Sequence, residues 1–254
     1  VLRHLEDSGY QCMDNIPPLL LAPAFTLCEK VELDTPVALG VDSRSGALFD
    51  ADAVCSAIDQ GGDSHEISIL FLEADTETLI EEALSFLKDL DTPRVLDLGT
   101  GSGCIAVTIA LDCPKAQVWA CDKSKDALSV AKCNAEVLGA KVSFVESDWF
   151  SAFADEKFDL IVSNPPYIEE NDEHLKALCF EPVSALTSGA DGLNDIRTLA
   201  AQAPEYIRGH GGIIVEHGYN QGESVAAIFR TAGFASVRTV RDLGDNPRLC
   251  CAVR

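Results

Sequence analysis

The stretch Val95-Leu-Asp-Leu-Gly-Thr-Gly-Ser-Gly103 decides the fold. Its apolar start predicts a buried β-strand, and three glycines at alternate positions follow directly. A helix is predicted immediately after the last glycine, so its N-terminal amides would face a ligand held by the loop. A strand, a glycine-rich loop and a helix in this order are typical of a nucleotide-binding α/β sheet. Because a tight turn also uses glycine for its positive φ, the loop alone does not establish a site.

From residue 77 onward the sequence alternates between helix and strand. Its apolar periods predict strands at 94–98, 118–121, 142–145, 158–163, 212–216, 236–241 and 249–253. Helices are predicted at 77–88, from the glycine loop to about 110, and at 125–138, 196–207 and 223–232. We therefore predict a doubly wound, Rossmann-like α/β sheet of seven strands that ends in an antiparallel hairpin.

Charge and pattern divide the 254 residues into two predicted domains. Residues 1–76 hold 3 basic and 14 acidic residues, which leaves 16 and 27 for residues 77–254, so each part has a net charge of −11. The shorter part predicts helices at 2–8, 19–30 and 51–59 and strands at 37–41 and 67–72, which would form part of a parallel sheet. We expect the boundary between residues 76 and 77.

The composition argues against several classes of protein. A net charge of −22 disfavours a large nucleic-acid interface, which needs clustered Lys and Arg, so no stable nucleic-acid binding is expected. No apolar run approaches the roughly 20 residues that span a bilayer, and the N-terminus has no signal-peptide pattern, so we expect a soluble, cytoplasmic protein. The ten cysteines form no C-x-x-C pair and the five histidines have no ligand spacing. Buried, reduced thiols and no metal site are therefore expected.

The glycine loop, formed by Gly99, Thr100, Gly101, Ser102 and Gly103, is a candidate cofactor site. Glycine lets a ligand approach the backbone because a Cβ would collide with it. The spacing is G-x-G-x-G and not the G-x-G-x-x-G of pyrophosphate-binding loops. S-adenosylmethionine, a nucleoside without phosphates, therefore fits better than a dinucleotide.

Polar residues follow the next two strands of the predicted sheet. Asp122 lies 19 positions beyond Gly103, where a carboxylate can accept hydrogen bonds from ribose hydroxyls, although it could instead cap the next helix. Asp148 follows the third strand and can accept a hydrogen bond from an adenine amino group. Trp149 offers an apolar face to the adenine ring or the sulfonium, although it could instead be a core residue.

The segment Ser163-Asn-Pro-Pro-Tyr167, after the apolar strand at 158–163, is the strongest functional signal. Pro165 and Pro166 fix the backbone and remove two N–H donors, which leaves carbonyl groups that can face a ligand. Asn164 offers an acceptor and a donor, suited to a planar carboxamide or an amino-purine edge. Tyr167 adds an aromatic wall. A structural turn alone does not require this combination.

With these motifs, residues 77–254 resemble the class I S-adenosylmethionine-dependent methyltransferases, most closely the HemK/PrmC-type glutamine methyltransferases of peptide chain release factors. The motifs are Val95-Leu-Asp-Leu-Gly-Thr-Gly-Ser-Gly103, Ser147-Asp-Trp-Phe150, Val162-Ser-Asn-Pro-Pro-Tyr-Ile168, Phe180-Glu-Pro182, Val215-Glu-His-Gly218 and Arg241-Asp-Leu-Gly-Asp-Asn246. The resemblance implies that the glycine loop, Asp122 and Trp149 hold S-adenosylmethionine. It also implies that Asn164 to Tyr167 hold the glutamine amide of a release factor's Gly-Gly-Gln loop.

A carboxamide nitrogen is a poor nucleophile because its lone pair is delocalised. The Asn164 side-chain oxygen and the Pro165 carbonyl could each accept one N–H of the amide. These two hydrogen bonds would orient the nitrogen towards the methyl–sulfur bond and stabilise its developing positive charge. No covalent enzyme intermediate is needed.

Residues 1–76 resemble the nucleotide-binding half of the RapZ-type RNase adapter family. The similar stretches are Val1-Leu-Arg-His-Leu-Glu-Asp-Ser-Gly-Tyr-Gln-Cys-Met-Asp-Asn-Ile-Pro17, Val37-Ala-Leu-Gly-Val-Asp-Ser-Arg-Ser45 and Ile69-Leu-Phe-Leu-Glu-Ala-Asp75. That family's phosphate-binding loop, G-x-x-x-x-G-K-[ST], would precede Val1 and is missing. We expect a partial P-loop-type α/β segment, a fragment without nucleotide-binding activity.

Two alternative functions stay open at this point. The methyltransferase family normally carries a helical release-factor-binding domain and a Pro-Arg-Pro segment before the stretch Asp75-Thr-Glu-Thr78, so an inactive fusion fragment is one alternative. An adenine amino-methyltransferase acting on DNA or RNA is the other, because N-P-P-Y also serves a flipped-out base. The net charge of −11 on residues 77–254 counts against that second alternative.

Overall fold

The computed structural model describes residues 11–13, 23–24, 37–39, 74–172, 175, 183–242 and 244–254. The chain forms two compact units, Val1–Leu70 and Phe71–Arg254. In the first unit, strand β1 (Gln11–Met13), which was not predicted, pairs in parallel with β2 (Val37–Leu39), which lies within the predicted strand at 37–41. The expected helices at 2–8 and 51–59 and the strand at 67–72 lie outside the described residues, as does most of the helix at 19–30. The expected boundary at 76/77 falls inside helix α4, which begins at Ala74.

The second unit contains the predicted succession of helices and strands. Its helices are α4 (Ala74–Leu87), α5 (Cys104–Asp112), α6 (Lys125–Leu138), α7 (Val183–Leu186), α8 (Asn194–Tyr206) and α9 (Gly222–Thr231). Its strands are β3 (Arg94–Leu98), β4 (Gln117–Asp122), β5 (Val142–Glu146), β6 (Phe158–Ser163), β7 (Ile207–Glu216), β8 (Ser236–Arg241) and β9 (Pro247–Val253). Among the described residues of this unit, the short α7 is the one element without a counterpart in the prediction.

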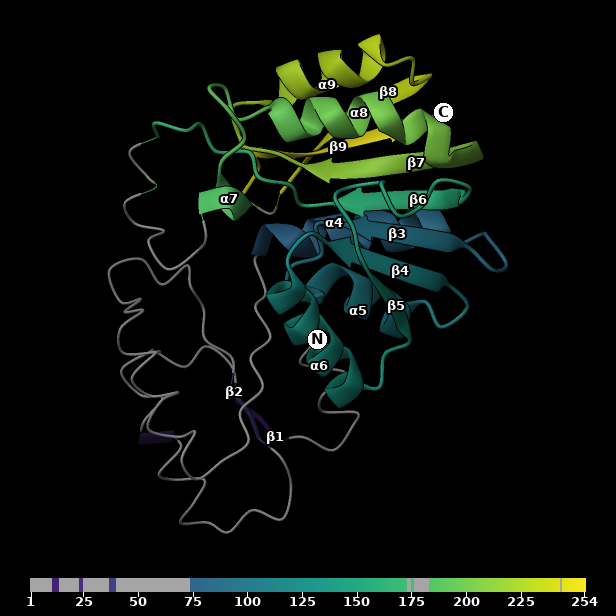
Figure 1. Ribbon diagram of the computed structural model, residues 1–254, viewed down its shortest axis with the longest axis vertical. Helices are drawn as coiled ribbons and strands as arrows, with labels where there is room; N and C mark the ends of the chain where they lie inside the picture. The colour runs from purple at the N-terminus through teal and green to yellow at the C-terminus, as the bar shows by residue number, and fades with distance from the viewer. Residues whose placement is uncertain are drawn as a thin grey trace. The chain divides into compact units, whose positions relative to one another are not determined.

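The seven strands form one mixed sheet in the order β5-β4-β3-β6-β7-β9-β8 (Figure 1). Strands β3 to β7 pair in parallel, whereas β9 pairs antiparallel with both β7 and β8. The predicted fold class, a seven-stranded Rossmann-like sheet with a C-terminal antiparallel hairpin, is therefore confirmed. Within the hairpin it is the second strand, β9, that lies next to β7.

The strand order reverses between β3 and β6. From β3 the chain proceeds outward to β4 and β5, and it then returns to the other side of β3 as β6. Leu98 and Ser163 are paired at the carboxyl ends of these two strands, and the Ser163 hydroxyl donates to the Leu98 carbonyl at 2.7 Å. At such a reversal the loops after the two strands leave in opposite directions, and open α/β sheets generally bind their ligands in the crevice between these loops.

Alternating side chains bury both faces of the sheet. Val95, Leu160 and Ile214 face the side covered by α4 and α5. Their neighbours Leu96, Ile161 and Ile213 face the side covered by α8 and α9. Because successive residues of a strand point to opposite faces, these strands read as continuous apolar runs. Helix α6 packs beside α5 along β4 and β5.

Strand β7 begins five residues earlier than the predicted strand at 212. Ile207 pairs with Phe158, and a register shift then separates this pair from Leu160 and Gly212. Gly211 lies in the shifted stretch, where a Cβ would come within 2.6 Å of the Asp159 carbonyl oxygen. The extension depends on this long-range pairing, which the local pattern does not contain.

Two expectations from composition can be compared with the described residues. Cysteines 104, 113, 121, 250 and 251 are buried and free, as expected, but Cys133 is exposed on α6, so the expectation is wrong there. Cys133 lies on the outer side of an amphipathic helix, where no apolar layer covers it. Among the residues placed by the structure, no helix has the length and apolarity to cross a bilayer.

Candidate active site

The glycine loop after β3 has the left-handed conformation at each of its glycines. Their φ angles are +69° at Gly99, +54° at Gly101 and +83° at Gly103. Side chains other than glycine rarely adopt this region because their Cβ collides with the backbone. The loop geometry therefore accounts for all three glycines before any ligand is considered.

The three glycines differ in which atoms an added Cβ would meet. A Cβ on Gly101 would meet no atom within 4 Å, whereas a Cβ on Gly99 would lie 3.4 Å from the indole of Trp149. A Cβ on Gly103 would lie 2.9 Å from the Cβ of Ala131 on α6. The packing of the loop against α6 therefore also requires Gly103, and contact of this glycine with a cofactor stays a prediction.

Asp97, in the middle of the β3 motif, is a buried carboxyl group that the sequence analysis did not select. Its Oδ2 accepts hydrogen bonds from the Thr100 hydroxyl at 2.6 Å and from the Ala106 N–H at 3.2 Å. Burial raises the pKa of Asp97 to about 7, against the opposing effect of these two hydrogen bonds. Its Oδ1 has no hydrogen-bond partner among the described residues. A carboxyl group inside an otherwise apolar strand was the signal that could have identified it.

Asp122, at the end of β4, holds the glycine loop. Its Oδ2 accepts from the Gly101 N–H at 3.0 Å, and its Oδ1 accepts from the Ser124 N–H at 2.8 Å. The cap of α6 is Ser124, whose side chain accepts from Ala127. The alternative that Asp122 caps this helix is therefore wrong. Each carboxylate oxygen has a second lone pair for a further donor.

Trp149 and Asp148 lie beside the loop, after β5. Trp149 is half-buried with a φ of +47°, and its carbonyl accepts from the Ser147 hydroxyl at 2.7 Å. Its indole packs against the apolar core and also faces Gly99. The core interpretation is confirmed, and contact of Trp149 with a cofactor stays a prediction. Asp148 is exposed, and its N–H donates to the Ser151 hydroxyl at 3.2 Å.

The remaining loop residue, Ser102, is held from α6. Its carbonyl accepts a hydrogen bond from the Asn134 side chain at 2.9 Å. Together the residues 97–103, 122 and 148–149 form what we call the glycine-loop half of the site.

The segment Asn164 to Tyr167 leaves β6 on the other side of the crevice. Pro165 is buried, and Asn164, Pro166 and Tyr167 are half-buried. The Tyr167 hydroxyl donates to Oε1 of Glu216 at 3.2 Å, which joins this segment to the end of β7. We call residues 164–167, 188–193 and 216–221 the NPPY half of the site.

Glu216, His217 and Gln221 are fully or nearly buried at this edge, and the sequence analysis assigned no function to them. Gln221 donates from Nε2 to the Tyr167 carbonyl at 2.9 Å and accepts at Oε1 from the Gly218 N–H at 2.8 Å. Nδ1 of His217 lies 2.8 Å from the Gly218 carbonyl, and burial lowers the pKa of this imidazole. The motif Val215-Glu-His-Gly218 was the available signal.

The chemistry of the glycine-loop half favours an uncharged, hydroxyl-bearing ligand. The loop offers backbone amides next to the carboxyl groups of Asp97 and Asp122. The Asp122 carboxylate would repel a polyphosphate, whereas it is a good acceptor for ribose hydroxyls. No group of three or more possible metal ligands occurs among the residues that the structure describes.

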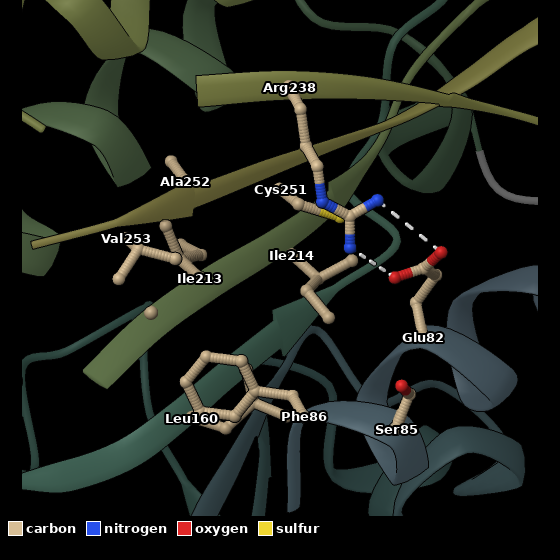
Figure 2. A pocket seen from close by; sticks show the side chains of 11 residues that line it. Glu82, Ser85, Phe86, Leu160, Ile213, Ile214, Arg238, Cys251, Ala252 and Val253 are labelled. Carbon is tan, nitrogen blue, oxygen red and sulfur yellow. Dashed lines mark hydrogen bonds and ion pairs between the residues drawn. The ribbon is translucent and has the colours of Figure 1, made fainter. Parts of the chain in front are cut away.

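A separate groove lies between α4 and strands β6 to β9. Figure 2 shows Glu82, Ser85 and Phe86 facing the strands across it, with Glu82 paired to the Arg238 guanidinium. None of the predicted site residues lines this groove. It opens on the body of the sheet and not at the carboxyl edge, where the two halves of the site meet.

Comparison with known protein families divides the chain near the same place as its fold. Residues 74–189 match the Methyltransferase small domain, and residues 1–84 match the RapZ-like N-terminal domain. In fold, the chain is similar to the catalytic domain of hMettl16 in complex with the MAT2A 3′UTR hairpin 6. That similarity has a TM-score of 0.60 at 15% identity, covering 81% of this chain and 82% of that one. It supports the class I methyltransferase fold.

Two relatives have much higher sequence identity. Release factor glutamine methyltransferase of Xylella fastidiosa (strain 9a5c) is 50% identical over 183 residues, covering 71% of this chain and 66% of the relative. The protein of the same name from Bordetella pertussis is 48% identical over 184 residues, covering 71% and 68%. The chain thus spans about two thirds of the length of these relatives. At this identity and coverage, the chain belongs to the release factor glutamine methyltransferase family.

Proposed function

We propose that the second unit transfers a methyl group from S-adenosylmethionine to the side-chain amide nitrogen of the glutamine in the Gly-Gly-Gln loop of peptide chain release factors. The observation that carries this proposal is the position of Asn164 to Tyr167 directly beside the glycine loop, where β3 and β6 pair and the strand order reverses. Membership of the family supports the choice of substrate.

The glycine-loop half fits S-adenosylmethionine, which supplies an electrophilic methyl group on sulfur when bound. Asp122 would accept hydrogen bonds from the ribose hydroxyls, and Asp148 would accept one from the adenine amino group. The open side of Gly101 leaves room for a ligand against the backbone. Trp149 would form an apolar wall beside the adenine ring or the sulfonium.

In the NPPY half, Asn164 and Pro165 would hold the acceptor amide. The Asn164 side-chain oxygen and the Pro165 carbonyl each accept one N–H, which turns the nitrogen lone pair towards the methyl group. As the new carbon–nitrogen bond forms, the methyl–sulfur bond breaks and S-adenosylhomocysteine is released. Positive charge develops on the nitrogen, the two oxygens stabilise it, and one N–H proton is then lost to solvent, which leaves a neutral N-methyl amide. Tyr167, held at its hydroxyl by Glu216, forms the wall of the acceptor site.

A protein substrate is consistent with the charge of this unit. The net charge of −11 on residues 77–254 opposes binding to a nucleic-acid backbone, although the N-P-P-Y segment could chemically accept an adenine amino group. Release factors act with the ribosome, so we place the reaction in the cytoplasm.

The test is incubation of the purified full chain with methyl-labelled S-adenosylmethionine and a release factor. Label is expected on the release factor and not on a variant whose Gly-Gly-Gln glutamine is changed to alanine. Asn164→Ala should lower the turnover number by about 10²–10³, because it removes one acceptor of the developing charge, while cofactor affinity measured by calorimetry stays unchanged.

Three results would overturn the proposal. Label on DNA or RNA would favour the adenine amino-methyltransferase, and an absence of cofactor affinity would favour an inactive remnant. Unchanged turnover in Asn164→Ala would remove the assigned function of that residue.

A further inference from the structure

Gln221 has hydrogen bonds that its place in the fold does not explain. It occupies the cap position of α9, where Ser, Thr, Asn or Asp usually accepts a hydrogen bond from the first turn of the helix. The Gln221 side chain makes no such bond. It instead points back across the crevice edge, is 8% exposed, and contacts three separate loops.

Both N–H donors and the oxygen of this carboxamide are in use. Nε2 donates to the Tyr167 carbonyl at 2.9 Å and to the Asp191 carbonyl at 3.3 Å. Oε1 accepts from the Gly218 N–H at 2.8 Å. A carboxamide has two donors in a fixed planar arrangement, so it can join two carbonyl groups only at one orientation. Gln221 thereby sets the spacing between the loops after β6, before α8 and after β7.

The loop before α8 closes the remaining space around the Tyr167 carbonyl. Gly192 has a φ of +68°, and a Cβ on it would lie 2.2 Å from that carbonyl oxygen and 2.8 Å from Nε2 of Gln221. Ile168, the residue after Tyr167, donates its N–H to the Leu186 carbonyl at 2.9 Å. The Tyr167 carbonyl is therefore fixed from more than one side, with Gln221 as its hydrogen-bond donor.

The position of this carbonyl matters because the residues before it are stiff. Pro165 and Pro166 each have a fixed φ, so fewer backbone dihedral angles can absorb a shift of the Tyr167 backbone between Tyr167 and Asn164. It is passed on to the two oxygens that would hold the acceptor amide. A displacement of about 1 Å at a reacting group can cost about 10² in rate.

We propose that Gln221 is a positioning residue for methyl transfer: its carboxamide fixes the Tyr167 carbonyl and, through the two prolines, the Asn164 and Pro165 oxygens. This inference rests on the proposed function. Gln221 does not touch the acceptor amide. It acts only on the NPPY half, because none of its hydrogen bonds reaches the glycine-loop half.

Two variants of similar size test the inference. Gln221→Glu keeps an oxygen for the Gly218 N–H but removes both N–H donors, and Gln221→Met removes all three hydrogen bonds without adding charge. The matched control is Gln202→Glu, the same substitution at an exposed position of α8. Turnover number and cofactor affinity are measured for each full-length protein with a labelled release factor assay.

We expect both Gln221 variants to lower the turnover number by about 10- to 100-fold, with cofactor affinity within about twofold of the unmodified chain. Gln202→Glu should match the unmodified chain in both. Unchanged turnover would overturn the inference. So would a loss of cofactor affinity in parallel with turnover, because general loosening of the fold would then explain both.

A second measurement does not depend on activity. The chain has four tyrosines, so incorporation of 3-fluorotyrosine gives a simple ¹⁹F NMR spectrum in which Tyr167→Phe identifies the Tyr167 signal. This signal should shift or broaden in both Gln221 variants and stay in place in Gln202→Glu. If the unmodified chain labels no release factor, the proposed function fails, and the spectrum still decides whether Gln221 positions Tyr167. An unmoved Tyr167 signal overturns the inference in either case.

Discussion

The two halves of the site are stabilised by different kinds of contact. In the glycine-loop half the bonded residues are close in sequence: Asp97 is 3 residues from Thr100, and Gly101 is 21 residues from Asp122. In the NPPY half Tyr167 is joined to Glu216 and Gln221, which follow 49 and 54 residues later. The first half is thus shaped by one strand–loop–helix unit and its neighbour, and the second by loops from three parts of the chain.

This difference predicts how each half responds to change. Alterations in the glycine-loop half should affect folding and cofactor affinity, because its residues form the loop and, in the proposed function, would face the cofactor. Alterations in the NPPY half should affect turnover, because its backbone carries the acceptor oxygens. The following predictions separate these two outcomes, starting with the largest effect.

The largest expected effect comes from the buried carboxyl group of Asp97. Its pKa is about 7 in the folded chain and near 3.8 when exposed, so between these values the folded state binds one more proton than the unfolded state. Binding of this proton stabilises the folded state. The contribution to the free energy of unfolding is complete below pH 3.8 and is lost as the pH rises through 7. At about 1.4 kcal/mol per pKa unit, the total is about 4 kcal/mol.

Asp97→Asn removes this titration because a carboxamide does not ionise in this pH range. The amide oxygen can still accept the hydrogen bonds from Thr100 and Ala106. Urea unfolding of both proteins at several pH values measures the effect. The free energy of unfolding of the original chain, relative to Asp97→Asn, should fall between about pH 4 and pH 8. Asp155→Asn, at an exposed turn, is the control and should show no such trend. Parallel pH curves for the original chain and Asp97→Asn would contradict the prediction.

In the NPPY half, Gly192→Ala should lower turnover by about 10² without changing cofactor affinity. The new Cβ would lie 2.2 Å from the Tyr167 carbonyl oxygen, a backbone atom, so the loop that carries Asn164 and Pro165 must move. Steady-state kinetics at saturating cofactor, together with calorimetry, measure the two quantities.

Gly189→Ala is the matched control for this prediction. Gly189 and Gly192 both have a left-handed φ, of +77° and +68°, so alanine adds a similar backbone strain of about 1–2 kcal/mol at each. The Cβ at position 189 meets the end of the Asn194 side chain, which is exposed and can turn away. Equal turnover in the two variants would show that strain in this loop, and not the Tyr167 carbonyl, determines the effect.

The contrast between contacts that are close in sequence and contacts that are distant in sequence also explains which elements the sequence could predict. Strands β3 and β6 and helix α6 match their predicted bounds because glycine, proline or a capping serine marks their ends locally. The early start of β7 was missed because it depends on pairing between Ile207 and Phe158. A local pattern cannot contain a pairing between residues so far apart.

The site shows this division residue by residue. Asp122 was selected because its distance from the glycine loop is a property of one βαβ unit, and it lies against Gly101. The motif Val215-Glu-His-Gly218 marks Glu216, but no local pattern indicates that Glu216 and Gln221 contact Tyr167, which belongs to a different loop. Asp97 was missed for another reason: it lies inside the motif that was used to identify the loop.

The smallest expected effect is on cofactor affinity in Asp122→Asn. In Asp122 the Gly101 N–H and the Ser124 N–H each donate to one carboxylate oxygen. The Asn side chain replaces one of these oxygens with an N–H₂ donor, so one of the two hydrogen bonds is lost. If one hydrogen bond from a ribose hydroxyl to the charged carboxylate is lost as a result, the cost is about 1.5 kcal/mol, which corresponds to about tenfold weaker binding of S-adenosylmethionine by calorimetry. Turnover at saturating cofactor should stay unchanged because Asp122 has no hydrogen bond to the NPPY half.

Asp126→Asn, at an exposed position in the first turn of α6, controls for the loss of one negative charge near the loop and should bind the cofactor normally. A fall in turnover with normal affinity in Asp122→Asn would mean that the two halves are coupled across the crevice. The pairing of Leu98 with Ser163 is the direct path for such coupling, because both loops begin at that pair. A loss of cofactor affinity with normal turnover in Asp122→Asn would show that the glycine-loop half can be altered without the NPPY half. This result is expected if the glycine-loop half depends on local backbone geometry and the NPPY half on side chains that are distant in sequence.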